Sequence, residues 1–155
     1  MTRCDQTRSI AMIQSVDEAT MTELMNKARD AATRAYVPYS HFPVGAAVLT
    51  GDGTLFSGCN IENASFGLTT CAERVAVFTA AAAGHRAIRA VAITAPRAPG
   101  TTPCGACRQV LREFVPSDGM LVLIDDAAAV RAMTLAELLP DSFGPDDLEA
   151  SPVGG

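Results

Sequence analysis

The spacing of apolar and polar positions predicts a helix and then a β-hairpin in the first half of the chain. Apolar residues recur at helical spacing from Met21 and stop before Pro38, which predicts a first helix. Residues 44–50 and 54–61 have the short, apolar composition that is typical of strands. Between them lies the glycine-flanked turn at residues 51–53, which favours an antiparallel hairpin.

The second half predicts another helix and a strand–helix–strand unit. Residues 70–83 are alanine-rich and end at Gly84, which indicates a helix that is buried on more than one side. Residues 90–95 and 120–124 read as short buried strands, and the segment between them ends in a helix with an apolar stripe that includes Cys107. Strand, helix and strand in this order predict a parallel crossover, and therefore an α/β fold.

The pattern predicts one domain between two weakly patterned ends. Residues 1–15 show no sustained periodicity, and we expect them to form a disordered leader. A last short helix is predicted at residues 135–139, and we expect a flexible polar tail at residues 146–155. No repeat or linker divides residues 16–145, and a chain of 155 residues that is 48% hydrophobic can build one core.

Charge and hydropathy narrow the classes of partner. The formal net charge is −5 and no basic cluster is present, which disfavours nucleic acid as a partner. No apolar run has the length of a membrane-spanning helix, and no secretion signal is recognisable. We therefore expect a cytoplasmic protein that does not contact a membrane.

Three of the five cysteines predict a zinc site. Clustered cysteines in a reducing compartment are more often metal ligands or catalytic groups than disulfides. Cys104 and Cys107 follow Pro103 at the start of a helix, three residues apart and therefore on one face. Cys71 begins the other predicted helix. If the two helix starts lie side by side, the positive helix ends favour three thiolates, which are the ligands that zinc needs.

The type of zinc site depends on whether a fourth protein ligand exists. A structural site uses four protein ligands, whereas a catalytic site keeps one position for water or substrate. His41 and His85 are the only histidines, and neither stands at ligand spacing from the cysteines. His85 lies about 18 Å along the predicted helix from Cys71, too far to reach the metal. His41 stays possible, and with it a structural zinc module that binds a partner.

Glu73 has two interpretations. Thr70 and Glu73 fit a capping box, in which the glutamate bonds back to the start of the helix. However, Cys-x-Glu followed by Pro-Cys-x-x-Cys is the signature of zinc deaminases. In that chemistry Glu73 takes a proton from the metal-bound water, passes it to the ring and later helps ammonia to leave. The pairing of both motifs favours the catalytic role.

Arg74, next to Glu73, also has two interpretations. It could hydrogen-bond the thiolates and offset part of their negative charge, or it could be an ordinary solvated arginine.

Four stretches resemble the small homotetrameric cytidine deaminases that act on free nucleosides: YVPYSHFPVGAAV from Tyr36, SGCNIENASFGLTTCAERVAVF from Ser57, PCGACRQVLREF from Pro103 and LAELLPDSFGP from Leu135. The resemblance implies a three-layer α-β-α sandwich with a mixed five-stranded sheet and one zinc ion per subunit. It also implies hydrolytic deamination of cytidine and deoxycytidine to uridine and deoxyuridine, a reaction of pyrimidine salvage.

The same resemblance implies substrate contacts by seven residues: Phe42, Asn60, Glu62, Ala64, Phe66, Ala72 and Phe143. Asn60 and Glu62 would bind the ribose, although a turn after the strand would also explain an asparagine there. Phe42 would pack on the base of its own subunit, and Phe143 would enter a neighbour's site, so that the homotetramer shares its active sites. Without the family, Phe143 reads better as a plug of the chain's own core. At Phe66 many members carry tyrosine, so a contact through that hydroxyl is absent.

Two other deaminase substrates are alternatives to plain nucleosides. Adenosine in RNA is disfavoured, because the first ligand here is cysteine and the chain is acidic. A modified cytosine nucleoside, such as a nucleoside antibiotic, is a closer alternative. Asn60, Glu62 and the Leu-Leu-Pro-x-x-Phe stretch favour the plain nucleoside.

Overall fold

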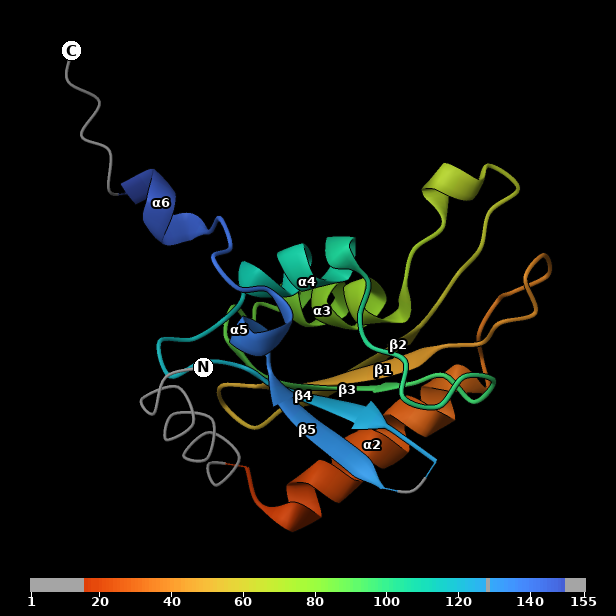
Figure 1. The fold of residues 1–155 in the computed structure, drawn as a ribbon, viewed down its shortest axis with the longest axis horizontal. Helices are drawn as coiled ribbons and strands as arrows, with labels where there is room; N and C mark the ends of the chain where they lie inside the picture. Colours follow the sequence, from red (N-terminus) through yellow and green to blue (C-terminus); the bar gives the residue numbers. More distant parts are fainter. Residues whose placement is uncertain (1–15, 128, 150–155) are drawn as a thin grey trace.

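A mixed five-stranded sheet with the order β2-β1-β3-β4-β5 forms the middle layer of the fold (Figure 1). The computed structural model describes residues 16–127 and 129–149. The strands are β1 (Gly45–Thr50), β2 (Leu55–Cys59), β3 (Ile88–Thr94), β4 (Leu121–Asp125) and β5 (Val130–Thr134). β3 and β4 are parallel, and the other neighbouring pairs are antiparallel. The predicted hairpin and the predicted parallel crossover are therefore confirmed.

Helices cover both faces of the sheet. Helix α2 (Glu18–Ala32) lies on one face, and α3 (Ala72–Ala82) and α4 (Gly105–Arg112) lie side by side on the other (Figure 1). Three short helices lie in the connections and near the end of the described chain: η1 (Phe66–Leu68), α5 (Leu135–Leu138) and α6 (Pro145–Glu149). This arrangement is the predicted three-layer α-β-α sandwich.

The central strands are buried on both faces because each face has its own helix layer. Alternate side chains of β1 pack in opposite directions: Ala46 and Val48 join the cluster under α3 and α4, and Ala47 and Leu49 join the cluster under α2. Two glycines allow the helices to lie directly on the strands. A Cβ built at Gly45 would lie 2.0 Å from the carbonyl oxygen of Ala28 in α2. A Cβ built at Gly58 in β2 would lie 2.6 Å from the backbone nitrogen of Ala76 in α3, so the helix layer that carries the site is also in direct backbone contact with the sheet.

The first helix is shorter than predicted. It ends at Ala32 rather than continuing towards Pro38, and the next three amides bond back over only three residues. Tyr36 then leaves the helical path, because its N–H donates to the carbonyl of Asn60 and its carbonyl accepts from Glu62. Pairing with a distant backbone segment therefore ends the helix before the proline does.

The residue pattern did not predict three elements: η1, β5 and α6. β5 is an edge strand whose burial rises along its length, from the exposed Val130 and Arg131 to the buried Thr134, so it lacks the alternation that a half-buried strand shows. Only the family resemblance implied a fifth strand. Helix α6 lies where the predicted domain meets the predicted tail, with Pro145 at its first position and two aspartates in its first turn.

The predicted leader at residues 1–15 and the tail from residue 150 lie outside the described residues. Within the described part of the chain, none of the helices combines the length and the apolar character needed to cross a membrane.

Candidate metal centre and active site

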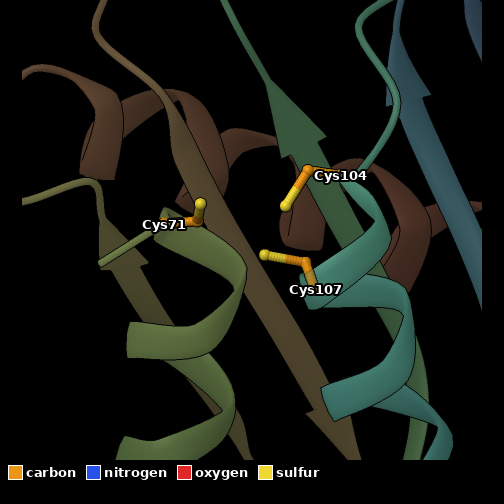
Figure 2. Close-up of side chains that lie close together, drawn as sticks. All are labelled: Cys71, Cys104 and Cys107. Atoms are coloured by element: carbon orange, nitrogen blue, oxygen red, sulfur yellow. The ribbon is translucent and has the colours of Figure 1, made fainter. Parts of the chain in front are cut away.

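The structure brings Cys71, Cys104 and Cys107 together between the starts of α3 and α4 (Figure 2). Their three sulfur atoms all lie within 4.8 Å of one another. Cys107 is buried, Cys71 is half-buried and Cys104 is exposed, so the cluster opens to solvent on the Cys104 side. The predicted convergence of one cysteine from one helix with a pair from the next is therefore confirmed.

The helix starts explain why thiolates are favoured here. Cys71 is the N-cap of α3 and Cys104 is the N-cap of α4, and neither helix start has a side-chain cap hydrogen bond. The first N–H groups of a helix have no partner inside the helix, and they place partial positive charge at its start. Two such starts side by side stabilise negative charge on the sulfur atoms between them.

The donor set fits a zinc ion. Zn–S bonds of about 2.3 Å put the sulfur atoms of a tetrahedral site about 3.8 Å apart, which the observed cluster can accommodate. Among residues 16–127 and 129–149, these three cysteines form the only group of three or more His, Cys, Asp or Glu residues with metal-ligand geometry. His41 is not part of it. Three protein ligands with one position left over are typical of a catalytic zinc site rather than a structural one.

Glu73 lies in the first turn of α3, two residues after Cys71, and is only 5% exposed. Burial raises the pKa of its carboxyl, and the charge of Cys71 raises this pKa further, while hydrogen bonds to its own backbone and to Cys107 oppose the shift. A carboxyl with a raised pKa beside the three thiols is placed to accept and return protons near the metal position.

The capping-box interpretation of Glu73 is wrong. The N-cap of α3 is Cys71 rather than Thr70, and Thr70 instead pairs through its backbone with Ile61. A true capping box occurs in α5, where the side chains and backbone groups of Thr134 and Glu137 bond reciprocally. Because the Glu73 carboxyl does not form a capping box with Thr70, that motif does not explain its burial.

Arg74 contacts one of the three cysteines, Cys71. Its Nη2 donates to the sulfur of Cys71 at 3.6 Å and to the carbonyl oxygen of Thr69 at 3.1 Å. Its buried Nε is the one buried side-chain nitrogen or oxygen without a hydrogen-bond partner among the described residues. An unsatisfied cationic donor beside three thiols fits a cluster that is deprotonated when metal binds. Arg74 is therefore not an ordinary solvated arginine, because its guanidinium bonds to Cys71 and Thr69.

The thiols influence one another. A hydrogen bond with Cys107 and the nearby Arg74 guanidinium lower the pKa of the Cys71 thiol to about 5. The same hydrogen bond raises the pKa of Cys107, because there it favours the protonated form. Zinc binding would displace the proton of this hydrogen bond, because the metal needs both sulfur atoms as thiolates.

Asn60 and Glu62 hold the loop that carries Phe42. The side chain of Asn60 accepts from the N–H of Val44 at 2.8 Å, and its amide nitrogen donates to the carbonyl of Phe42 at 2.9 Å. The Glu62 carboxylate accepts from the N–H groups of residues 39 and 40 at 2.9 and 3.2 Å. Asn60 and Glu62 therefore do more than terminate a strand, because both side chains fix the loop around the half-buried Phe42.

The remaining predicted substrate residues divide into two groups. Ala72 is fully buried at the start of α3, next to the thiols. Ala64 and Phe66 lie on the long loop between β2 and α3, which projects from the body of the fold (Figure 1). Phe66 is 73% exposed, and Phe143, in the segment between α5 and α6, is 60% exposed. The residue pattern alone favoured Phe143 as a plug of the chain's own core. Its exposure shows that it does not have this role.

The sequence pattern did not predict the structural roles of two arginines at this site, Arg97 and Arg108. Arg97 donates to the carbonyl oxygen of His41 at 2.6 Å, where the backbone has a positive φ of 54°. Arg108 connects the loop before Cys104 with the end of α5. Both arginines bond to backbone segments far away in the sequence, and no local pattern signals such contacts.

Comparison with known proteins agrees with this geometry. A protein-family model described as "Cytidine and deoxycytidylate deaminase zinc-binding region" matches residues 18–122. A cytidine deaminase of Sporosarcina psychrophila is 44% identical over 126 residues, which cover 81% of this chain and 93% of that protein. A cytidine deaminase of Mycobacterium tuberculosis (strain ATCC 25618 / H37Rv) is 47% identical over 125 residues, with coverage of 81% and 90%.

The fold is also similar to a solved structure. The crystal structure of a cytidine deaminase from Burkholderia pseudomallei superposes with a TM-score of 0.72 at 45% sequence identity. The match covers 79% of this chain and 98% of that one.

Proposed function

The chain belongs to the cytidine deaminase family, and from this premise we propose that it is a hydrolase that converts cytidine and deoxycytidine to uridine and deoxyuridine. The reaction consumes one water and releases one ammonia. The observation that supports it best is the buried Glu73 carboxyl beside the cluster of Cys71, Cys104 and Cys107. A purely structural zinc module would have no use for a buried carboxyl at this place, and it would need a fourth protein ligand.

In this proposal the three cysteines hold one zinc ion per subunit, and Glu73 moves the protons. Zinc bound to the thiolates supplies the Lewis-acid activation that makes water a nucleophile near neutral pH. Glu73 accepts a proton from the attacking water and passes it to N3 of the pyrimidine ring, as the new C4–O bond forms. Glu73 then helps to transfer a proton to the amino group, and the C4–N bond breaks to release ammonia.

Arg74 offsets the negative charge of the ligands. Three thiolates on a dication leave a net negative charge, which works against the activation of water at the metal. The hydrogen bond from Arg74 to Cys71 withdraws charge from that sulfur. We therefore assign Arg74 to tuning the metal site rather than to contact with the nucleoside.

Substrate contacts come from the loops around the metal position. The half-buried Phe42 offers an apolar ring to the base, and the polar groups of Asn60 and Glu62 face the same loop, where they suit the ribose hydroxyls. The backbone of Ala72 lies at the start of α3, where it suits polar groups of the base. The acidic composition, with a net charge of −5, agrees with a small neutral substrate rather than nucleic acid.

A homotetramer with shared active sites completes this proposal. Several large apolar side chains are exposed on the projecting loop and near the end of the described chain: Ile61, Phe66, Leu68, Phe143 and Leu148. Such side chains are typical of surfaces that another chain covers. Phe143 would then reach a neighbour's site, and the assembly would act in the cytoplasm, where its thiols stay reduced. Sedimentation at the mass of four chains is expected, and a stable monomer with full activity would contradict it.

The substrate is tested by following the ultraviolet absorbance of cytidine, deoxycytidine and adenosine with the zinc-loaded protein. We expect turnover of both cytosine nucleosides and none of adenosine. A modified cytosine nucleoside in the same series tests the alternative. Rapid turnover of that nucleoside alone would change the substrate assignment but leave the zinc-dependent deamination intact.

A further inference from the structure

Arg108 of α4 joins two segments that are distant in sequence. Its Nε donates to the carbonyl oxygen of Pro103 at 2.7 Å, and its Nη2 donates to Oγ1 of Thr102 at 3.0 Å. Its Nη1 donates to the carbonyl oxygen of Leu138 at 2.7 Å. Pro103 immediately precedes Cys104, and Leu138 is the last residue of α5. One half-buried side chain thus connects the loop that presents a metal ligand with the end of α5.

The segment that follows α5 is also held by α4. Gln109 donates from Nε2 to the carbonyl oxygen of Phe143 at 3.0 Å. Arg112 donates from Nε to Oγ of Ser142 at 3.1 Å and pairs with Asp146 at 3.3 Å. The helix that carries two of the three metal ligands therefore fixes the backbone on both sides of Phe143.

Arginine is suited to this connection for geometric reasons. The guanidinium is planar and presents several donors in fixed directions, whereas a lysine ammonium is a point charge on a flexible stem. The three acceptors of Arg108 are two carbonyls and one hydroxyl, so the side chain joins uncharged groups by charge-assisted bonds. Leu138 is at the end of a helix, where carbonyl groups lack partners inside the helix.

We infer that Arg108 is a positioning residue that couples the metal ligand Cys104 to the segment that presents Phe143. Its loss frees the Thr102–Pro103 loop at one end and the end of α5 at the other. The first change loosens the hold on the metal, and the second displaces Phe143. The link to substrate rests on the proposed contact of Phe143 with the nucleoside, but the link to the metal does not.

The test replaces Arg108 by methionine, which keeps the apolar stem and removes all three hydrogen bonds. We expect Arg108→Met to release zinc to a colorimetric chelator about tenfold faster and to raise KM for cytidine about tenfold, as loss of charge-assisted hydrogen bonds would do. The value of kcat should fall less than KM rises. Arg34→Met is the matched control, because Arg34 is an exposed arginine whose guanidinium pairs with Asp30. Both quantities should stay at the wild-type level in this variant.

A double-variant cycle separates positioning from general loosening. In a Phe143→Ala background, the additional effect of Arg108→Met on KM should disappear, whereas faster zinc release should persist. An equal rise of KM in both backgrounds, or zinc release at the wild-type rate, would overturn the inference. Wild-type KM in Phe143→Ala alone would overturn the link to substrate, and cytidine turnover in the same samples would show whether the deaminase assignment still stands.

A milder variant serves if Arg108→Met does not fold. Thr102→Val removes one of the three acceptors and keeps the shape of the side chain. We expect zinc release and KM to rise about threefold, as for the loss of one hydrogen bond. Wild-type values for both would count against the coupling.

Discussion

Gly58→Ala should damage both the stability of the fold and the metal centre, because α3 lies on β2 at this glycine. A Cβ built at Gly58 lies 2.6 Å from the backbone nitrogen of Ala76 and 2.8 Å from Cβ of Val75. Carbon atoms pack best at about 3.5–4.0 Å, so the helix has to move by roughly 0.7 Å or more. The atoms in the way include helix backbone, so a change of rotamer does not relieve the contact.

The displacement has two measurable costs. Inserting a methyl group into a packed interface destabilises a protein by about 1–3 kcal/mol. In addition, α3 begins at Cys71 and carries Glu73, whereas the other two metal ligands belong to α4. A shift of α3 alone therefore changes the distances inside the cluster. A misplacement of about 1 Å can lower turnover about 100-fold.

Urea unfolding and cytidine turnover of the zinc-loaded protein measure these costs. Gly51→Ala is the matched control, because a Cβ there would meet its nearest atom, Cβ of Ala87, only at 3.4 Å. We expect a lower urea midpoint and at least tenfold lower kcat for Gly58→Ala, and nearly wild-type values for Gly51→Ala. Wild-type stability and turnover in Gly58→Ala, or equal losses in both variants, would refute the direct contact between helix and strand as the cause.

Three further changes have distinct expected outcomes. The Arg29 guanidinium holds the pKa of Asp125 below its usual 3.8, so this stabilisation is present above about pH 4 and is lost as the pH falls through the lowered pKa. Because Arg29 is half exposed, Asp125→Asn should lower the free energy of unfolding in urea by only about 1 kcal/mol at pH 7. This loss should vanish near pH 2. A loss that persists at pH 2 would exclude the ion pair as its source. Cys104→Ala should lose zinc by metal analysis and melt at a lower temperature, because metal binding and folding are coupled, and full zinc content would remove Cys104 from the ligand set. His41→Asn, which suits the positive φ of this residue, should keep one zinc ion per chain and its activity, whereas loss of zinc would revive the structural-module alternative.

Local patterns were sufficient for the elements that are buried and periodic. The alanine-rich helix, the hairpin and the crossover were predictable because their apolar spacing reflects the burial of both sheet faces. The end of α2 was not, because it depends on the pairing of Tyr36 with Asn60, which is distant in sequence. The edge strand β5, whose burial rises steadily along its length, lacks the alternation on which strand prediction relies.

The candidate site shows the same division. The spacing of Cys104 and Cys107 after Pro103 predicted a pair of ligands on one helix face, and the deaminase signature joined them to Cys71 and Glu73. The sequence left a capping role for Glu73 and a solvated Arg74 open, because only the packed structure tells where their side chains lie. The contacts of Arg108 depend on α5 lying against α4, and no spacing along the chain encodes that neighbourhood.

The central claim, that Glu73 carries the protons of a zinc-dependent deamination, is tested most directly by Glu73→Gln. The variant keeps the size of the side chain and removes its ability to accept a proton at neutral pH. Initial rates with cytidine and the zinc content are measured on the same samples. We expect one zinc ion per chain and a fall in kcat of about 100-fold to 10,000-fold, the usual contribution of a general acid–base group. Near-normal turnover in a variant that still holds its zinc would contradict the account.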